Sequence, residues 1–219
     1  MTEDRLEQAR KAYEQAVYGG DAGALTESER ALDAVEADTA LARAKILHAR
    51  FQSATAGNGD APAEDPAELP LFERALELYK ALSDARGEAE ALFWIGCVHQ
   101  FIRRDNDTAI PYLERSCRLA AETGDKHTRS EALRHLGIAA HAAGRLDEAR
   151  ERLEESSRLR RETGSLAGVA SNMVGLAYIA AAQDRRAAAL SILDEAHTIA
   201  RAHGAHAVMR HLEQARSRI

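Results

Sequence analysis

The sequence predicts an all-α fold, an α-solenoid of about five antiparallel helix pairs followed by a C-terminal capping helix. The first observation is compositional, because the 219 residues include 46 Ala but only 14 Gly and 4 Pro. Ala is the strongest helix former, whereas Gly and Pro are the weakest. The second observation is internal repetition with a period near 40 residues. Such a period is typical of stacked helical repeats.

The repetition is visible at two sets of positions. Leucine and glycine recur at intervals of 40 residues, and an apolar residue followed by glycine recurs upstream at intervals of 41 and 38. These positions are Leu113, Leu153 and Leu193; Gly124, Gly164 and Gly204; and Ile95-Gly96, Leu136-Gly137 and Val174-Gly175. Each unit therefore consists of two segments joined by a short turn of variable length.

Both segments of a unit are predicted to be helices. Leu153, Ser156 and Leu159 place small and apolar side chains on one face of a helix, and charged residues fill the other faces. Gly124 suits the left-handed conformation that closes a helix, and Asp125 suits the N-cap of the next one. A helix, a glycine turn and a second helix thus follow one another along the chain.

The unit from Leu133 to Ser156 resembles the tetratricopeptide repeat. The matching positions are Leu133, Leu136, Gly137, Ala140, Gly144, Ala149, Leu153 and Ser156, and Tyr178 supplies the aromatic residue of the family in the following unit. Small residues at these places allow two antiparallel helices to approach closely. The resemblance implies a right-handed superhelix with the first helix of each pair on its concave side. The 40-residue period is similar to the variety found in sensor regions of bacterial regulators, which implies a bacterial, regulatory protein.

The whole chain is predicted to be a single domain, 1–219, built from such units. The units are 1–38, a degenerate pair with helices near 2–18 and 22–36; 39–86, with helices near 39–54 and 69–86; the clear units 87–125, 126–165 and 166–204; and the cap helix 205–219. In the second unit Tyr79 replaces the small Ser116, and His48 stands where Gly96 is expected. The stretch from Gly57 to Pro70 holds three of the four prolines, and the long loop 55–69 that it overlaps is either a tolerated insertion or a functional arm.

Composition excludes several function classes. A net charge of -6 and a pI near 5.9 disfavour direct nucleic-acid binding, which needs a positive field. No run approaches 18 apolar residues, so no membrane span is expected, and the charged N-terminus is unlike a secretory signal. Cys97 and Cys117 cannot form a disulfide framework, which favours a reducing, cytoplasmic location.

No catalytic or metal-binding motif is present, so we predict no enzyme activity, no catalytic residues, no metal and no cofactor. The nearest histidine group, His203, His206 and His211, lacks the spacing of a metal site on one helix face. The oligomeric state stays open, and exposed apolar residues of the terminal helices are candidates for self-association. These candidates are Leu6, Tyr13, Val17 and Met209.

The resemblance implies a concave groove to which each unit contributes side chains. Its positions are Lys45, Ala49 and Gln52; Glu90, Phe93, Cys97, Gln100 and Phe101; Glu131, Arg134, Ile138 and His141; and Val169, Asn172, Leu176 and Ile179. Of these, the predicted partner-binding residues are Lys45, Gln52, Glu90, Phe93, Gln100, Glu131, Arg134, His141 and Asn172. Phe93, Phe101, Leu176 and Ile179 fit equally well as core between neighbouring helices.

Three functions remain open from the sequence. The first is a non-catalytic module that binds a protein or peptide segment in its groove, where aromatic rings anchor the segment and cations hold a carboxylate. The second is a regulatory sensor subunit for a small ligand or signalling peptide. The third is a small-molecule enzyme in which Glu90, Glu131, Arg134 and His141 are the polar cavity groups.

Overall fold

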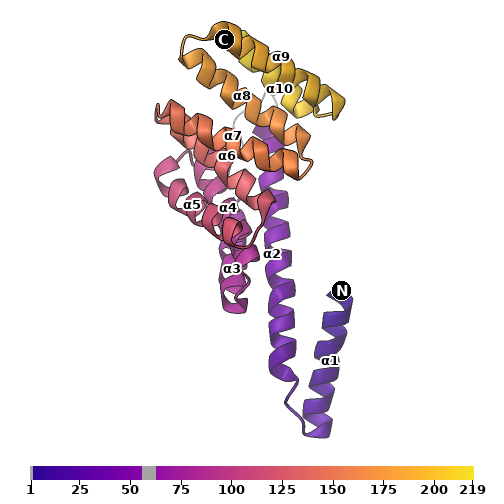
Figure 1. The fold of residues 1–219 in the computed structure, drawn as a ribbon. Helices are drawn as coiled ribbons and strands as arrows, with labels where there is room; N and C mark the ends of the chain where they lie inside the picture. The colour runs from indigo at the N-terminus through magenta and orange to yellow at the C-terminus, as the bar shows by residue number, and fades with distance from the viewer. Residues whose placement is uncertain (1, 56–62) are drawn as a thin grey trace.

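The computed structural model describes residues 2–55 and 63–219, and within these ranges it confirms the all-α fold, without strands. The helices are α1 (Thr2–Gly19), α2 (Leu25–Thr55), α3 (Glu68–Leu82), α4 (Ala85–Cys97), the π-helical turn η1 (Val98–Ile102), α5 (Asn106–Glu122), α6 (Lys126–Ala142), α7 (Leu146–Glu162), α8 (Leu166–Ala182), α9 (Arg186–Ala202) and α10 (His206–Arg218). Successive helices pack antiparallel, and α10 covers α8 and α9 at the end of the stack (Figure 1).

The helix α2 differs from the prediction. We expected separate helices near 22–36 and 39–54, but a single helix runs from Leu25 to Thr55. The predicted break is wrong because the segment 36–40 contains neither Gly nor Pro, and Ala37 and Ala40 are buried in the core. The Tyr79 hydroxyl also donates to Asp38 Oδ1 at 2.9 Å, which holds this part of α2 against α3.

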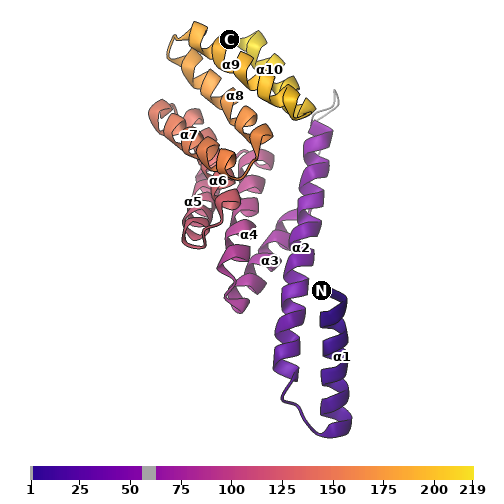
Figure 2. The same ribbon diagram turned by 45° about the vertical axis from the view of Figure 1, so that its right-hand side comes forward.

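The two halves of the long helix α2 pack against different helices. Its first half packs with α1 as a hairpin that projects away from the other helices, whereas its second half lies beside α3 and α4 (Figures 1 and 2). In both views its C-terminal end points toward the part of the stack that holds α9 and α10. Leu6, Tyr13 and Val17 are exposed on α1, and Met209 is half-buried on α10.

The turns confirm the predicted ends of the helices. Gly124, Gly144, Gly164 and Gly204 all adopt the left-handed conformation, with φ between 61 and 75°. The Asp125 side chain caps α6 by accepting hydrogen bonds from the backbone N–H groups of His127 and Thr128. These tight ends set consecutive helices close together.

The repeated small residues lie between packed helices. A Cβ atom on Gly96 would stand 2.7 Å from Leu113, and one on Gly137 would stand 3.1 Å from Leu153. The Ser116 hydroxyl donates to the Ala89 carbonyl at 2.7 Å, which ties the second helix of that unit to its first. The core is therefore a series of large leucines packed against glycine, alanine and serine.

The loop predicted over 55–69 falls partly outside the described residues. Residues 56–62 are not described, so the choice between an insertion and a functional arm stays a prediction. After this gap, Glu64 forms an ion pair with Arg103 at 2.7 Å, and α3 begins at Glu68. The assignment of the chain to one repeat domain with the boundaries given above likewise stays a prediction.

Candidate functional site

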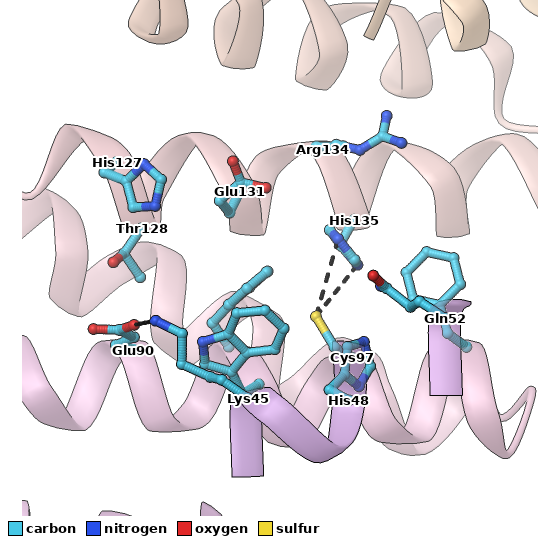
Figure 3. A pocket seen from close by; sticks show the side chains of 13 residues that line it. Lys45, His48, Gln52, Glu90, Cys97, His127, Thr128, Glu131, Arg134 and His135 are labelled. Atoms are coloured by element: carbon cyan, nitrogen blue, oxygen red, sulfur yellow. Dashed lines mark hydrogen bonds and ion pairs between the residues drawn. The ribbon is translucent and has the colours of Figure 1, made fainter. Parts of the chain in front are cut away.

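A cavity of about 360 Å³ lies between α2, α4 and α6, the first helices of three successive units. In Figure 3, α6 forms one wall, and α4 and α2 lie opposite. Six of the nine predicted partner-binding residues line this cavity. They are Lys45, Gln52, Glu90, Phe93, Glu131 and Arg134.

Aromatic rings form one side of the cavity. Phe93 packs edge-on against Trp94 and His135, with ring centroids 5.1 Å apart in both pairs. Phe101 packs in the same way against His135 at 5.0 Å and keeps 40% of its surface exposed. Phe93 is only 5% exposed and belongs to the core, so Phe101 supplies most of the accessible surface of this wall, an aromatic surface of the kind that anchors side chains in binding sites.

Lys45 and Glu90 form an ion pair at one end of the cavity. Lys45 Nζ donates to Glu90 Oε1 at 2.8 Å and also lies 5.6 Å from the centre of the Trp94 ring (Figure 3). Both side chains are half-exposed, so this pair neutralises its own charge at the rim.

Glu131 is held by an arginine that the sequence analysis did not single out. Arg160 is buried, and its Nη2 lies 2.6 Å from Glu131 Oε1 while its Nη1 donates to the Gly168 carbonyl at 2.7 Å. A Cβ atom on Gly168 would stand 2.6 Å from the same Nη1, so glycine leaves room for this contact. Burial lowers the pKa of Arg160, which nonetheless stays cationic beside the carboxylate.

Arg134 has no such partner. Its Nη1 donates only to the Ser171 carbonyl at 3.4 Å and to Asn172 Oδ1 at 3.5 Å, which are long for charged hydrogen bonds. No carboxylate of the described residues lies within 4.0 Å of its guanidinium. Burial lowers the pKa of Arg134 to about 10, so the group keeps its positive charge at neutral pH.

Gln100, predicted to face the groove, instead supports it from behind. Its amide nitrogen donates to the His135 carbonyl at 3.1 Å, and its Oε1 accepts from His135 Nδ1 at 2.8 Å. Burial and the neighbouring arginines hold the pKa of His135 well below its usual range, while burial raises the pKa of the Cys97 thiol. The 3.7 Å contact between Cys97 Sγ and His135 Nδ1 therefore joins a thiol to a neutral imidazole, not an activated nucleophile to a base.

A second buried pair supports the wall formed by α2. His48 Nδ1 lies 2.7 Å from Glu68 Oε1, both side chains are buried, and burial raises the pKa of Glu68. His48 also packs edge-on against Trp94 at 5.3 Å. The sequence had marked His48 only as a departure from the repeat, and the pair with Glu68 is its physical reason.

Two further predicted residues lie outside the cavity. Asn172 is buried and donates to the hydroxyl oxygens of Ser156 and Ser157 at 2.9 and 3.1 Å, so it ties α8 to α7. His141 is half-buried near the C-terminal end of α6 and does not line the cavity. Of the apolar groove candidates, Val169 and Ile179 are fully buried, and Phe93 is a buried member of a core cluster.

The described part of the chain holds neither a cluster of metal-ligating side chains nor a membrane-spanning helix. There, no three His, Cys, Asp or Glu side chains gather as a candidate metal site. Over residues 2–55 and 63–219, no helix has both the length and the apolar character needed to cross a membrane.

Comparison with known proteins agrees with this geometry. The family model for the tetratricopeptide repeat matches residues 99–162, which include the cavity residues of α6. Residues 99–162 are tetratricopeptide repeats. Over most of its length the chain is similar in fold to the crystal structure of BtubC (BKLC) from P. vanneervenii, with a TM-score of 0.50. That match covers 93% of this chain and 91% of the other at 14% identity, so it shows the fold alone. No curated protein matches the sequence.

Proposed function

We propose that this protein is a non-catalytic interaction module that holds a segment of a partner protein in the cavity between α2, α4 and α6. The observation that carries the proposal is the composition of this cavity. Three successive first helices supply an aromatic wall, a neutralised rim pair and one unpaired cation, Arg134. A stack of repeats creates an extended surface of this kind without needing any single helix to form a site.

The chemistry of the buried polar groups supports a binding role over a catalytic one. The cysteine and histidine that touch are neutral, and the two acids that line the cavity are each paired with a cation. His141, one of the four residues that the enzyme alternative needs, lies outside the cavity. A cytoplasmic location and a regulatory role remain predictions from the sequence.

Site-specific photo-crosslinking in extracts of the native host tests this proposal. A photoreactive amino acid at Gln52, exposed on the cavity rim, is compared with one at Glu151, exposed on α7. We expect protein adducts at position 52 that disappear when Phe93→Ala and Arg134→Glu are added, and no equivalent adducts at position 151. Equal crosslinking at both positions, or adducts that survive both substitutions, would overturn the proposal.

A small-ligand sensor is the second candidate, and one observation favours it. The cavity volume of about 360 Å³ lies within the range of roughly 300–1,000 Å³ that small-molecule sites occupy. Native mass spectrometry of the protein purified from its host separates the two candidates. A bound species of small mass that Phe93→Ala releases would support the sensor, whereas a protein adduct at position 52 supports the interaction module.

A further inference from the structure

Equivalent positions in successive repeats can be compared to see how a cation on one first helix finds its carboxylate. In the register set by Gly96, Gly137 and Gly175, Lys45, Phe93, Arg134 and Asn172 occupy equivalent positions, and so do Ala42, Glu90, Glu131 and Val169. Lys45 bonds to Glu90, that is, to the residue three places earlier in the next unit. A cation at this position can therefore receive its carboxylate from the following repeat.

The next repeat cannot provide that carboxylate for Arg134. The residue in the place of Glu90 is Val169, which is fully buried and apolar. The acid nearest in sequence, Glu131, is bonded to Arg160. Two guanidinium groups therefore share one carboxylate in a poorly solvated part of the fold, and Arg134 is attracted to Glu131 without a hydrogen-bonded carboxylate of its own. An unpaired, partly desolvated charge is costly, and an anionic occupant would relieve this cost.

Arg134 also stands between two hollows. On one side is the cavity with the aromatic wall; on the other is a hollow of about 200 Å³ between α6, α8 and α10, lined by Arg134, Ser171, Val174, Tyr178, His211 and Gln214. An anion on Arg134 would consequently sit in the middle of an occupant that fills both hollows. A side-chain carboxylate inside a chain meets this condition, whereas a chain end does not.

We propose that the occupant is an extended internal segment of a partner protein that places an aromatic side chain against Phe93 and Phe101 and an Asp or Glu carboxylate on Arg134. The inference rests on the proposed function and adds the chemistry of the partner. A guanidinium donates two parallel hydrogen bonds to a carboxylate, so the acid fixes the position of the segment. Lys45, whose charge Glu90 already neutralises, contributes little to this selection.

Peptide selection on the full-length protein tests this chemistry. A phage library displays random 12-residue segments fused at their C-terminal end, so that any carboxylate must come from a side chain. We expect the selected segments to combine an aromatic residue with Asp or Glu. The strongest is then synthesised with acetylated and amidated ends, and its affinity is measured by calorimetry.

The decisive comparison pairs the acid of the peptide with Arg134. A charge-assisted hydrogen bond of about 1.5–3 kcal/mol corresponds to a loss of roughly 10- to 100-fold in affinity when the peptide acid becomes its amide. Arg134→Gln should cause the same loss, and combining both changes should add little further. Arg161→Gln, on the exposed face of α7 and outside the cavity, is the control and should change affinity less than about 3-fold, and Arg134→Lys should recover part of the loss. Far-UV circular dichroism checks that each variant keeps its helices.

The outcomes separate this inference from the proposed function. Selected segments that bind at the cavity but lack an acid, or whose acid contributes equally with and without Arg134, would overturn the inference and leave the interaction module intact. A selection whose bound segments are all insensitive to Phe93→Ala would overturn both.

Discussion

Replacing Arg160 by Ala tests whether this arginine, which stands in place of an alanine of the repeat, stabilises the fold. Arg160 stands where the neighbouring repeats have the fully buried Ala120 and Ala200, so an alanine fits the backbone here. The substitution removes the contacts of Arg160 with Glu131 Oε1 at 2.6 Å and with the Gly168 carbonyl at 2.7 Å.

The expected cost follows from the burial of the two partners. Removing one partner of a fully buried ion pair costs about 3–5 kcal/mol because the other charge is left uncompensated. The Glu131 side chain is 25% exposed and regains some water, and Arg134 still attracts it, so we expect Arg160→Ala to reduce the free energy of unfolding by about 2–3 kcal/mol. For a chain of 219 residues this corresponds to a decrease in Tm of about 4–12 °C.

Thermal and urea unfolding, followed by far-UV circular dichroism, measure this effect. Arg161→Ala on the exposed face of α7 is the matched control and should change the stability by less than about 0.5 kcal/mol. Adding Glu131→Gln to Arg160→Ala removes the stranded charge and should restore part of the loss. An Arg160→Ala variant as stable as the Arg161→Ala control would refute the reasoning.

Three further predictions concern the elements around the cavity. The folded state holds His135 neutral, whereas the unfolded chain takes up a proton below a pKa of about 6.5. The free energy of unfolding should therefore decrease by at most about 1 kcal/mol as the pH is lowered from 6.5 to 5.5. His135→Gln should flatten this part of the urea-derived stability curve, and an unchanged slope would contradict the assignment. Gly96→Ala should lower the melting temperature more than Gly175→Ala. The methyl group at position 96 would stand 2.7 Å from both Cγ and Cδ2 of Leu113, whereas the one at position 175 would meet only the tip of Leu153, at 2.8 Å. Equal melting temperatures would show that the packing adapts. Thr39→Pro should break α2 at a cost of about 3 kcal/mol, whereas Thr39→Ala should be nearly neutral, and hydrogen exchange of the amides in α2 measures the difference.

Much of the fold was predictable because the residue types that recur in the repeat determine the local structure. Glycine with positive φ closes the helices at positions such as Gly124, and the 40-residue spacing of leucine marks the core. The boundary within α2 was not predictable from the repeat period. It depends on whether a turn signal is present, and residues 36–40 are all compatible with a helix.

The site was predictable only in part. The resemblance to the tetratricopeptide repeat implies that side chains of the first helices face a groove, so Lys45, Glu90 and Arg134 could be assigned to it, and all three line the cavity. Asn172 occupies an equivalent position but turns to Ser156 and Ser157, because burial forces an amide to find local partners.

The supporting groups are harder to find from sequence. Arg160 lies on a second helix, and its role depends on the space that Gly168 leaves for it in the next unit. His48 requires Glu68, 20 residues away across the long loop. Such pairs depend on three-dimensional proximity that no local pattern encodes.

Trp94 provides the most direct test of the central claim that the cavity between α2, α4 and α6 is the binding surface. It is the only tryptophan of the chain and lines the cavity, so its fluorescence reports on that site alone. Titration with a selected peptide that lacks tryptophan should shift the emission of Trp94 with the affinity found by calorimetry, and Phe93→Ala should weaken both signals together. Binding detected by calorimetry with an unchanged Trp94 spectrum would place the partner elsewhere and contradict the account.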